Sequence, residues 1–435
     1  MKAKWNTRQI FDLSLILLFI YAPTLVFLPF AFSKFVLVYL IGLTFLDKKF
    51  LIQNINSFKQ GHFLKFFLIT SLVIVSYFLL LTIYTNNYNI VFVQQTFWLL
   101  IEGVIGSVLL YNYLINRYSK VIVLRMLLGV VTFQSVIVIL TFLFPPLRDL
   151  INSFLLITDD RHVTSYRMRG LSNGGGAGLS YVQALGVLIA SILIVFDKKS
   201  RSYYLLCAII ISISQIFIAR TGLIFSVLVL LSVFVQESIN NKSFTRLIKQ
   251  LLIGVLLFFG IYNVGLYFMD AQAKIVFEER VLNRAFEFYY NYEESGNLET
   301  NSTNVLQNMY ILPENDLGLL FGEGIWDSAG QNDRTLIFGR KVDSDVGFIR
   351  MIFAFGLILT IAYYIVYLIY LKDIYKSLGG HLLGIILFSL LIIFILGETK
   401  EPFLIRMSGT NKILIILYSV LTVYPKYKSY HTINR

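Results

Sequence analysis

The stretch YRMRGLSNGGGAG, residues 166–178, combines the residue types of an anion-binding loop. Arg167 and Arg169 precede a run of glycines, after which an apolar segment begins. A guanidinium can bond two phosphate oxygens at once, glycine backbone can approach a ligand closely, and the free N–H groups of a helix N-terminus attract anions. We therefore expect a cradle for phosphate or pyrophosphate, with backbone positions Gly174, Gly175, Gly176 and Gly178. The alternative is a flexible loop whose glycines only let helices pack closely.

A second pair of arginines lies within residues 271–296, AQAKIVFEERVLNRAFEFYYNYEESG. The apolar residues of this segment recur at helical spacing, which predicts an amphipathic helix. Arg280 and Arg284 are four residues apart and share a face of that helix, and Glu287 extends the face and could neutralise one of them. The pair is either a second clamp for an anion or a solvated helix face with an internal ion pair.

Two carboxylates, Asp343 and Asp345, flank Ser344 just before the apolar run 346–370. Asp345 could cap the following helix, where the helix dipole favours a carboxylate by about 0.3–1 kcal/mol, orient an arginine or bind sugar hydroxyls. The triplet also looks like the metal-binding carboxylate pair of nucleotide-sugar transferases. Those enzymes use cytoplasmic donors, whereas the charge distribution places this triplet on the outer side, so the metal interpretation is disfavoured.

The composition defines the elements that must position these residues. Of 435 residues, 57% are hydrophobic and 14% are charged, which is far from the balance of a soluble domain. About twelve apolar runs could cross a bilayer, and we predict an all-α polytopic membrane protein. The runs lie at 12–28, 31–46, 66–84, 90–112, 122–144, 178–196, 203–218, 221–236, 250–268, 346–370, 381–397 and 413–424.

Lysine and arginine predict how these spans are oriented. The basic N-terminal tail belongs in the cytoplasm, and no small-residue cleavage site follows the first apolar run, so it is expected to be retained. Alternation then puts both termini and a set of short basic loops on the cytoplasmic side, at 47–65, 113–125, 197–201, 237–249 and 371–380. The net charge of +12 therefore has a topological cause and does not require a nucleic acid partner.

The same alternation divides the chain into five parts. They are N-terminal spans (1–144), a first large outer loop (145–177), central spans (178–268), a second large outer loop (269–345), and C-terminal spans with a cytoplasmic tail (346–435). Basic loops flank residues 203–236 on both sides, so this segment must cross twice and turn near Arg220. Because the cytoplasmic loops are short, we expect the chemistry on the outer, periplasmic face.

Glu102 lies in the middle of a predicted span, where a charge costs about 2.5–3.5 kcal/mol on insertion scales. It is therefore expected to face inward, either in a functional role or as a protonated or paired structural group. The single Cys207 excludes an intrachain disulfide, and the four histidines have no metal-ligand spacing. No metal or organic cofactor is expected.

Several segments together resemble a known family. They are similar, in the same order, to characteristic segments of the Wzy-type O-antigen and capsule polymerases, within the wider group that includes the O-antigen ligases: RMRGLSNGGGAG, ARTGLIFS, ERVLNRAFEFYYNYEESG, LLFGEGIW, DSDVGFIRMIFAFG and GETKEPFLI. In that family an arginine precedes a glycine by eleven residues in each large loop. Arg167 and Gly178 have this spacing, whereas Arg280 and Arg284 match by context alone. The resemblance implies a GT-C-like membrane fold.

The resemblance also implies an activity in the bacterial inner membrane. Repeat units would arrive on undecaprenyl pyrophosphate, and the enzyme would transfer the growing chain to the non-reducing end of a new unit, releasing the carrier pyrophosphate. Preorganised cations would stabilise that leaving group, and a base would take the proton of the acceptor hydroxyl. The implied cations are Arg167, Arg169, Arg220, Arg280 or Arg284, and Lys400, and the candidate bases are Asp345 and His162.

The implied partners are undecaprenyl-pyrophosphate-linked oligosaccharides, membrane lipid, a separate chain-length regulator and the flippase of the same pathway. Two alternatives stay open. An O-antigen ligase would use the same kind of donor. A flippase or transporter fits twelve spans with both ends inside, although such folds often consist of two similar halves, and no such repeat is evident here.

Overall fold

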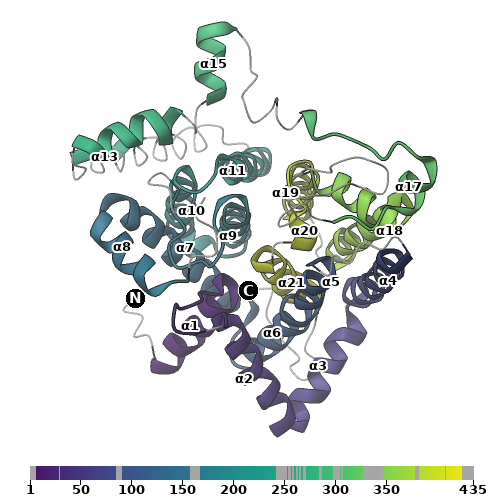
Figure 1. Cartoon of the computed structure of the whole chain (residues 1–435). Coiled ribbons are helices and arrows are strands. Elements are labelled where there is room, and N and C mark those ends of the chain that lie inside the picture. Colours follow the sequence, from purple (N-terminus) through teal and green to yellow (C-terminus); the bar gives the residue numbers. More distant parts are fainter. Residues whose placement is uncertain are drawn as a thin grey trace.

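The structure is a computed structural model that describes most of the chain. The described residues are 6–28, 30–84, 91–156, 167–241, 252, 256, 259–260, 263, 266–267, 271–283, 287–296, 304, 307–326, 344, 346–377, 382–406 and 408–423. These residues are helical or lie in connections between helices, and they contain no β-strand. The predicted all-helical class is therefore confirmed (Figure 1).

The helices of the first half occupy most of the chain up to residue 196. They are α1 (Thr7–Tyr21), α2 (Phe32–Leu46), α3 (Lys48–Gln60), α4 (His62–Tyr84), α5 (Val91–Trp98), the π-helix η1 (Leu99–Gly106), α6 (Ser107–Ile115), α7 (Lys120–Leu143), α8 (Pro145–Phe154) and α9 (Gly176–Phe196).

The second half begins with the short 3₁₀-helix η3 (Lys198–Ser200). It continues with α10 (Arg201–Ile216), α11 (Arg220–Asn241), α13 (Ala271–Val276), the π-helix η4 (Phe277–Leu282), α15 (Glu287–Ser295), α17 (Asp316–Phe321), α18 (Gly347–Ser377), α19 (Leu382–Glu398), α20 (Phe403–Arg406) and α21 (Ser408–Thr422).

Five helical segments of the described residues are long and apolar enough to cross a membrane. They are α4, the continuous segment Val91–Ile115, α7, α9 and α18. All the predicted apolar runs apart from 250–268, most of which lies outside the described residues, coincide with helices of the structure. Several of the other helices are shorter than a full span. The twelve membrane crossings therefore stay a prediction.

Helix α9 lies at the centre of one half of the bundle. In its most apolar window 83% of the residues are buried, against 28% for α4, and it packs against α7, α10, α11 and α21 (Figure 1). Small residues allow close crossings there, since a Cβ added to Gly186 would lie 2.4 Å from Val131 Cγ1. The outward apolar side chains of α4, such as Leu80, are suited to contact with lipid.

The predicted turn near Arg220 is present. Helix α10 ends at Ile216 and α11 begins at Arg220, with the Ala219 N–H donating to the Gln215 carbonyl at 3.0 Å. The two helices are tied together by Gln215 Nε2, which donates to Ser226 Oγ at 2.6 Å. The charge pattern on both sides of this segment was therefore sufficient to predict a helical hairpin.

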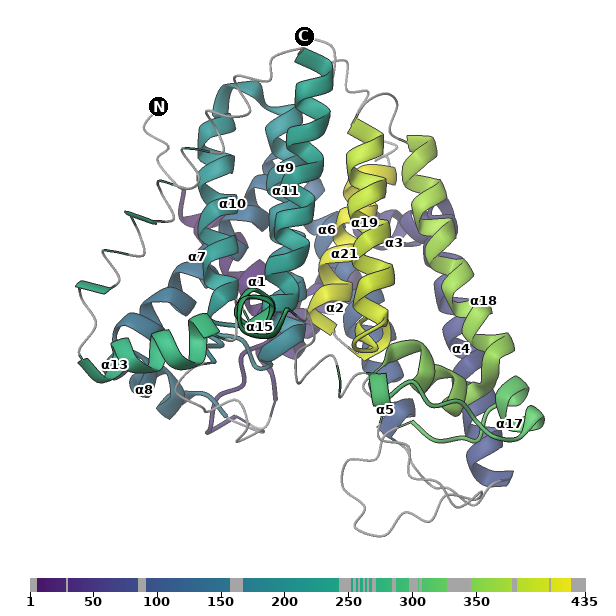
Figure 2. The same cartoon turned by 90° about the horizontal axis from the view of Figure 1, so that it is seen from above.

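The bundle has two ends, and the described segments that were predicted as loops lie at one end or the other. Residues 167–175, 217–219 and 397–406 meet at one end, which we call the arginine end. Helices α8, α13 and α17 lie towards this same end (Figure 2). Residues 47–61, 111–119 and 423 meet at the opposite end, which we call the amide end.

Two segments predicted as loops contain helices. Residues 48–60 form α3, because Asp47 Oδ1 caps its start by accepting the N–H groups of Lys49 and Phe50, at 2.9 and 3.3 Å. Residues 145–154 form α8, which begins with proline at its first positions, where no backbone donor is lost. Within the segment predicted to form an amphipathic helix, residues 271–282 and 287–295 are helical.

Candidate functional site

The loop that carries Arg167 and Arg169 is held in place by one buried glutamine. Gln134 of α7 is fully buried, and its Nε2 donates to the Arg169 carbonyl at 2.7 Å while its Oε1 accepts the Leu171 N–H at 3.1 Å. Next to it, Ser135 Oγ donates to Gln183 Oε1 of α9 at 2.8 Å. A polar network between the apolar helices α7 and α9 therefore fixes the backbone of residues 169–171.

Arg169 is a buried cation in this loop. Only 7% of the residue is exposed, and its Nη2 donates to Asn152 Oδ1 of α8 at 3.4 Å. No carboxylate of the described residues forms an ion pair with it. Burial lowers the pKa of Arg169 from its ordinary value, yet arginine stays charged in proteins. The half-buried Arg167 lies two residues earlier.

The glycine run forms the start of α9. Gly175 is its N-cap and no side chain caps the helix, so the first N–H groups are left for other acceptors. Gly176 has φ +60°, a conformation that favours glycine, and a Cβ on Gly174 would meet open space. Gly178 lies in the first turn.

Asn173 gives a second sign of an unfilled polar site. Its N–H donates to the Tyr21 carbonyl at 3.1 Å, which ties the loop to the end of α1. Its side-chain Oδ1 is buried and accepts no hydrogen bond from the described residues. A buried acceptor without a donor is costly, so a ligand hydroxyl at this position would be stabilising.

The α10–α11 turn brings Arg220 to the same place. The Met168 N–H, between the two loop arginines, donates to the Phe217 carbonyl at 2.8 Å. Helix α11 crosses the first turn of α9 so closely that a Cβ on Gly222 would lie 2.5 Å from the Ser180 carbonyl oxygen. A glycine at 222 is therefore needed to keep Arg220 beside the cradle.

Lys400 joins this cluster from the far end of the chain. Its Nζ donates to Thr221 Oγ1 at 2.8 Å, next to Arg220. Its loop is fixed by the buried Glu398, whose carboxylate accepts the Leu404 N–H and the Tyr364 hydroxyl, both at 2.8 Å. The structure thus brings Lys400 close to Arg220, two residues that were both predicted to bind the pyrophosphate.

The segment 271–296 reaches Arg220 through Glu287. Its Oε2 forms an ion pair with Nη1 of Arg220, and both side chains are mostly buried. The side chains of Arg280 and Arg284, one of which Glu287 was predicted to neutralise, lie outside the described residues; among the described residues Glu287 pairs with Arg220 of α11. Phe277 anchors the same loop by packing on Phe142 and Phe217, with ring centroids 5.5 and 5.9 Å away.

Some predicted site residues lie outside the described part of the structure. They are His162, Arg284, Asp345 and the side chain of Arg280. We define the cationic cluster as Arg167, Arg169, Arg220 and Lys400, which the structure does gather at the arginine end.

Three helix N-termini reinforce the charge of the cationic cluster. Helices α9, α11 and α21 all begin at the arginine end, and a Cβ on Gly409, in the first turn of α21, would lie 3.1 Å from the Ile20 carbonyl and 3.2 Å from Val182 Cγ2 of α9. Each N-terminus carries roughly half a positive charge. The arrangement can therefore bind a group with several negative charges.

Glu102 lies beside this end in a buried ion pair. Lys412 Nζ of α21 donates to Glu102 Oε2 at 2.8 Å and to the Phe19 carbonyl at 2.9 Å, and Ser33 Oγ donates to the same Glu102 oxygen at 2.8 Å. The expectation that Glu102 faces inward is confirmed, and Lys412 was missed. The sequence held a signal for Lys412, because a lysine at the edge of an apolar run needs a partner.

Comparisons with known proteins leave the site to be interpreted on its own geometry. No protein-family model matches the chain, and no similar protein was found among curated sequences or among solved structures. Among the described residues, no group of three or more His, Cys, Asp or Glu side chains could hold a metal ion. What is established is an all-helical chain with apolar helices long enough to span a membrane and a cationic cluster at one end.

Proposed function

We propose that this protein is a polysaccharide polymerase of the bacterial inner membrane. It joins oligosaccharide repeat units carried on undecaprenyl pyrophosphate, on the periplasmic face, to build O-antigen or capsule. The observation that carries the proposal is the cationic cluster of Arg167, Arg169, Arg220 and Lys400, at the end of the bundle where three helices begin. This cluster suits a diphosphate better than a single carboxylate, because a diphosphate carries several charges within reach of several donors.

The chemistry follows from where charge develops. The acceptor hydroxyl oxygen forms a bond to the anomeric carbon of the growing chain, and the bond from that carbon to the carrier pyrophosphate breaks. The pyrophosphate leaves with the electron pair, and fixed cations that stabilise it contribute about 10²–10³ in rate for each donor. The hydroxyl proton passes to a base, for which Asp345 and His162 remain the candidates.

The surroundings of the cluster suit the lipid part of such a substrate. Apolar side chains are exposed on the outward faces of many helices, and they can contact both bilayer lipid and a polyprenyl chain. The predicted cytoplasmic segments 47–65 and 113–125 meet at the end away from the cluster, which supports a periplasmic position for the cationic site. The expected flippase and chain-length regulator would act on the same side.

A second candidate, a lipid-linked oligosaccharide flippase, is favoured by one observation. The Glu102–Lys412 pair is a buried charged pair between apolar helices, and Glu102 lies in a π-helix. Charged groups inside membrane domains and π-helical segments both occur at transport and other functional sites. An O-antigen ligase remains the nearest alternative within the same chemistry.

Deletion of the gene separates the three activities. A polymerase deletion leaves surface glycan of one repeat unit. A ligase deletion removes surface glycan and accumulates polymer on the carrier, and a flippase deletion lacks even the single repeat. The first result supports the proposal, and either of the others replaces it.

The site itself is tested by Arg169→Ala. At unchanged membrane abundance we expect polymer to fall by about 100-fold or more. Arg148→Ala is the matched control, because Arg148 lies on α8 at the same end and, among the described residues, its side chain bonds only the adjacent Asp149, at 3.4 Å. Polymer that persists in Arg169→Ala, or that disappears equally in Arg148→Ala, would remove Arg169 from the mechanism.

A further inference from the structure

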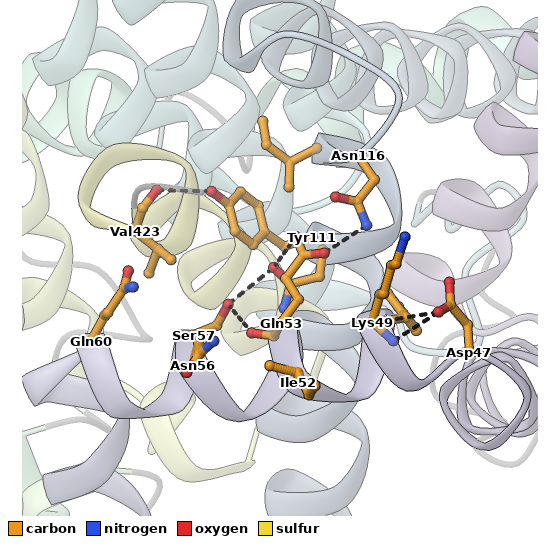
Figure 3. Close-up of a pocket in the computed structure, with 13 residues that line it drawn as sticks. Asp47, Lys49, Ile52, Gln53, Asn56, Ser57, Gln60, Tyr111, Asn116 and Val423 are labelled. Atoms are coloured by element: carbon orange, nitrogen blue, oxygen red, sulfur yellow. Dashed lines mark hydrogen bonds between the residues drawn. The ribbon is translucent and has the colours of Figure 1, made fainter. Parts of the chain in front are cut away.

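A cavity at the amide end lies far from the cationic cluster. It has a volume of about 510 Å³ and is formed by α3, the end of α6 and Val423 beyond α21. Figure 3 shows Lys49, Gln53, Ser57 and Gln60 following one another along α3. This volume is within the usual range for small-molecule sites, and the proposed polymerase reaction makes no use of it.

The floor of this cavity is a closed amide network. The buried Asn112 donates through Nδ2 to Asn54 Oδ1 at 2.7 Å, and its Oδ1 accepts Ser57 Oγ at 3.0 Å and Gln53 Nε2 at 3.3 Å. Asn116 Nδ2 donates to Gln53 Oε1 at 2.7 Å. Because these groups satisfy one another, the floor is rigid and polar without needing a ligand.

The rim of the cavity, in contrast, holds polar groups that the protein does not use. The side chains of Asn56 and Gln60 line the cavity and form no hydrogen bond with any described residue. Amides of this kind can both donate and accept. They would suit a ligand with ester, hydroxyl or phosphate oxygens.

One charge of each sign lies at the α3 start of the cavity. The Asp47 carboxylate accepts only backbone N–H groups, and Lys49 forms no ion pair with any described residue. Both side chains are exposed and line the cavity. The lining therefore matches a zwitterion and not a group with net negative charge.

The position of α3 places this zwitterionic lining next to lipid. Leu51, Ile52 and Ile55 on α3 are between 39% and 46% exposed, and Phe45 and Leu46 at the end of α2 are 84% and 86% exposed. Asn54 and Ser57 of α3 face inward together with Phe50. A helix with exposed apolar residues, above a cavity lined by both polar and apolar side chains, belongs at the headgroup level of a bilayer.

We propose that this cavity binds the headgroup of a zwitterionic phospholipid with a primary ammonium, that is, phosphatidylethanolamine. The ammonium donates to Asp47, the phosphate lies against Lys49, and the Asn56 and Gln60 amides bond the remaining headgroup oxygens. The acyl chains run along the exposed apolar residues of α2 and α3. This site does not depend on the proposed polymerase activity.

The test is native mass spectrometry of the full-length protein in detergent with added dioleoyl lipids. We expect retention of phosphatidylethanolamine to exceed that of phosphatidylcholine, which cannot donate from its quaternary nitrogen, and of phosphatidylglycerol, by about fivefold, the upper end for an exposed charge pair. Equal retention of the three lipids, or preference for phosphatidylglycerol, would overturn the proposal.

Variants on α3 locate the site. Asp47→Asn keeps the helix cap, since asparagine caps as well as aspartate, and should abolish the preference over phosphatidylcholine. Lys49→Gln should weaken the retention of both phosphatidylethanolamine and phosphatidylcholine. Lys48→Gln, one residue away and outside the lining, should weaken the retention of neither. Asn56→Phe fills the cavity from a partly exposed position and should block retention. Unchanged retention in Asn56→Phe, or an equal loss in Lys48→Gln, would place the lipid elsewhere and refute the assignment.

Discussion

Replacing Lys412 by methionine should destabilise the protein strongly, because it leaves a carboxylate buried without its cation. Lys412 has no exposed surface, and Glu102 is 8% exposed at its side chain. Methionine has nearly the length of lysine and preserves most of the packing around the Phe19 ring, whose centroid lies 4.6 Å from the lysine nitrogen. The change therefore removes charge while altering volume little.

The size of the effect follows from the contacts. Removing one partner of a buried ion pair costs about 3–5 kcal/mol, so Lys412→Met and Glu102→Gln should each lose that much. In the double variant the new amide at position 102 can still accept from Ser33, and the Phe19 carbonyl loses its donor, which costs about 1–3 kcal/mol. The double variant should be more stable than either single variant.

The assay is equilibrium unfolding of the purified protein in mixed micelles, with Lys59→Met as a control because Lys59 is exposed on α3. We expect a coupling free energy of about 3 kcal/mol or more between the two positions. If the single variants unfold like the wild type, or if their losses simply add, the pair does not hold α21 against η1. Stable single variants without activity would instead assign the pair to function.

Two further predictions test the arginine end, and a third tests the opposite end of α9. Gln134→Leu should lower the free energy of unfolding by about 2–4 kcal/mol, because the Arg169 carbonyl and the Leu171 N–H lose their partner. Polymer synthesis should fall as well. An unaltered free energy of unfolding would contradict this. Glu287→Gln should lower KM for the lipid-linked substrate by about 2–5-fold with kcat unchanged, because Arg220 loses a competing anion; a raised KM would refute the competition. The hydrogen bond from Tyr204 lowers the pKa of Asp197 in the folded protein. The Asp197 carboxylate therefore stabilises the fold fully above the ordinary carboxyl pKa of about 4, and this contribution is lost as the pH falls through the lower folded pKa. In thermal unfolding, Asp197→Asn should therefore differ from the wild type equally at neutral and mildly acidic pH, and the difference should shrink only as the pH falls below the ordinary carboxyl pKa; a constant difference would exclude this role.

Much of the helical framework could be predicted, because apolar runs and basic loops are local signals. The hairpin around Arg220 follows from the basic segments on either side of it, and the helices of the second outer loop follow from their periodicity. Helix α3 was missed because its pattern is reversed. Leu51, Ile52 and Ile55 are exposed, whereas Asn54 and Ser57 are buried beside Phe50, so its sequence does not look like that of a helix packed on an apolar core.

The site was predictable in its residue types and not in its pairings. The loop arginines and Lys400 carry a recognisable combination of charge and glycine, and the structure gathers them. No local pattern could join Thr221 to Lys400, 179 residues apart. Gln134 gave a usable signal, since a polar amide inside an apolar run must find partners, but nothing in the sequence names the loop that it holds.

The difference between Arg169 and Arg220 suggests an order of events in the proposed reaction. Arg169 forms no ion pair with any described residue, whereas Arg220 is held by Glu287 from the second outer loop. A diphosphate arriving at the glycine cradle would meet Arg169 first and could then compete with one carboxylate for Arg220. Exchange of Glu287 for phosphate would release the second loop from α11, so substrate binding and loop position would be coupled through one guanidinium.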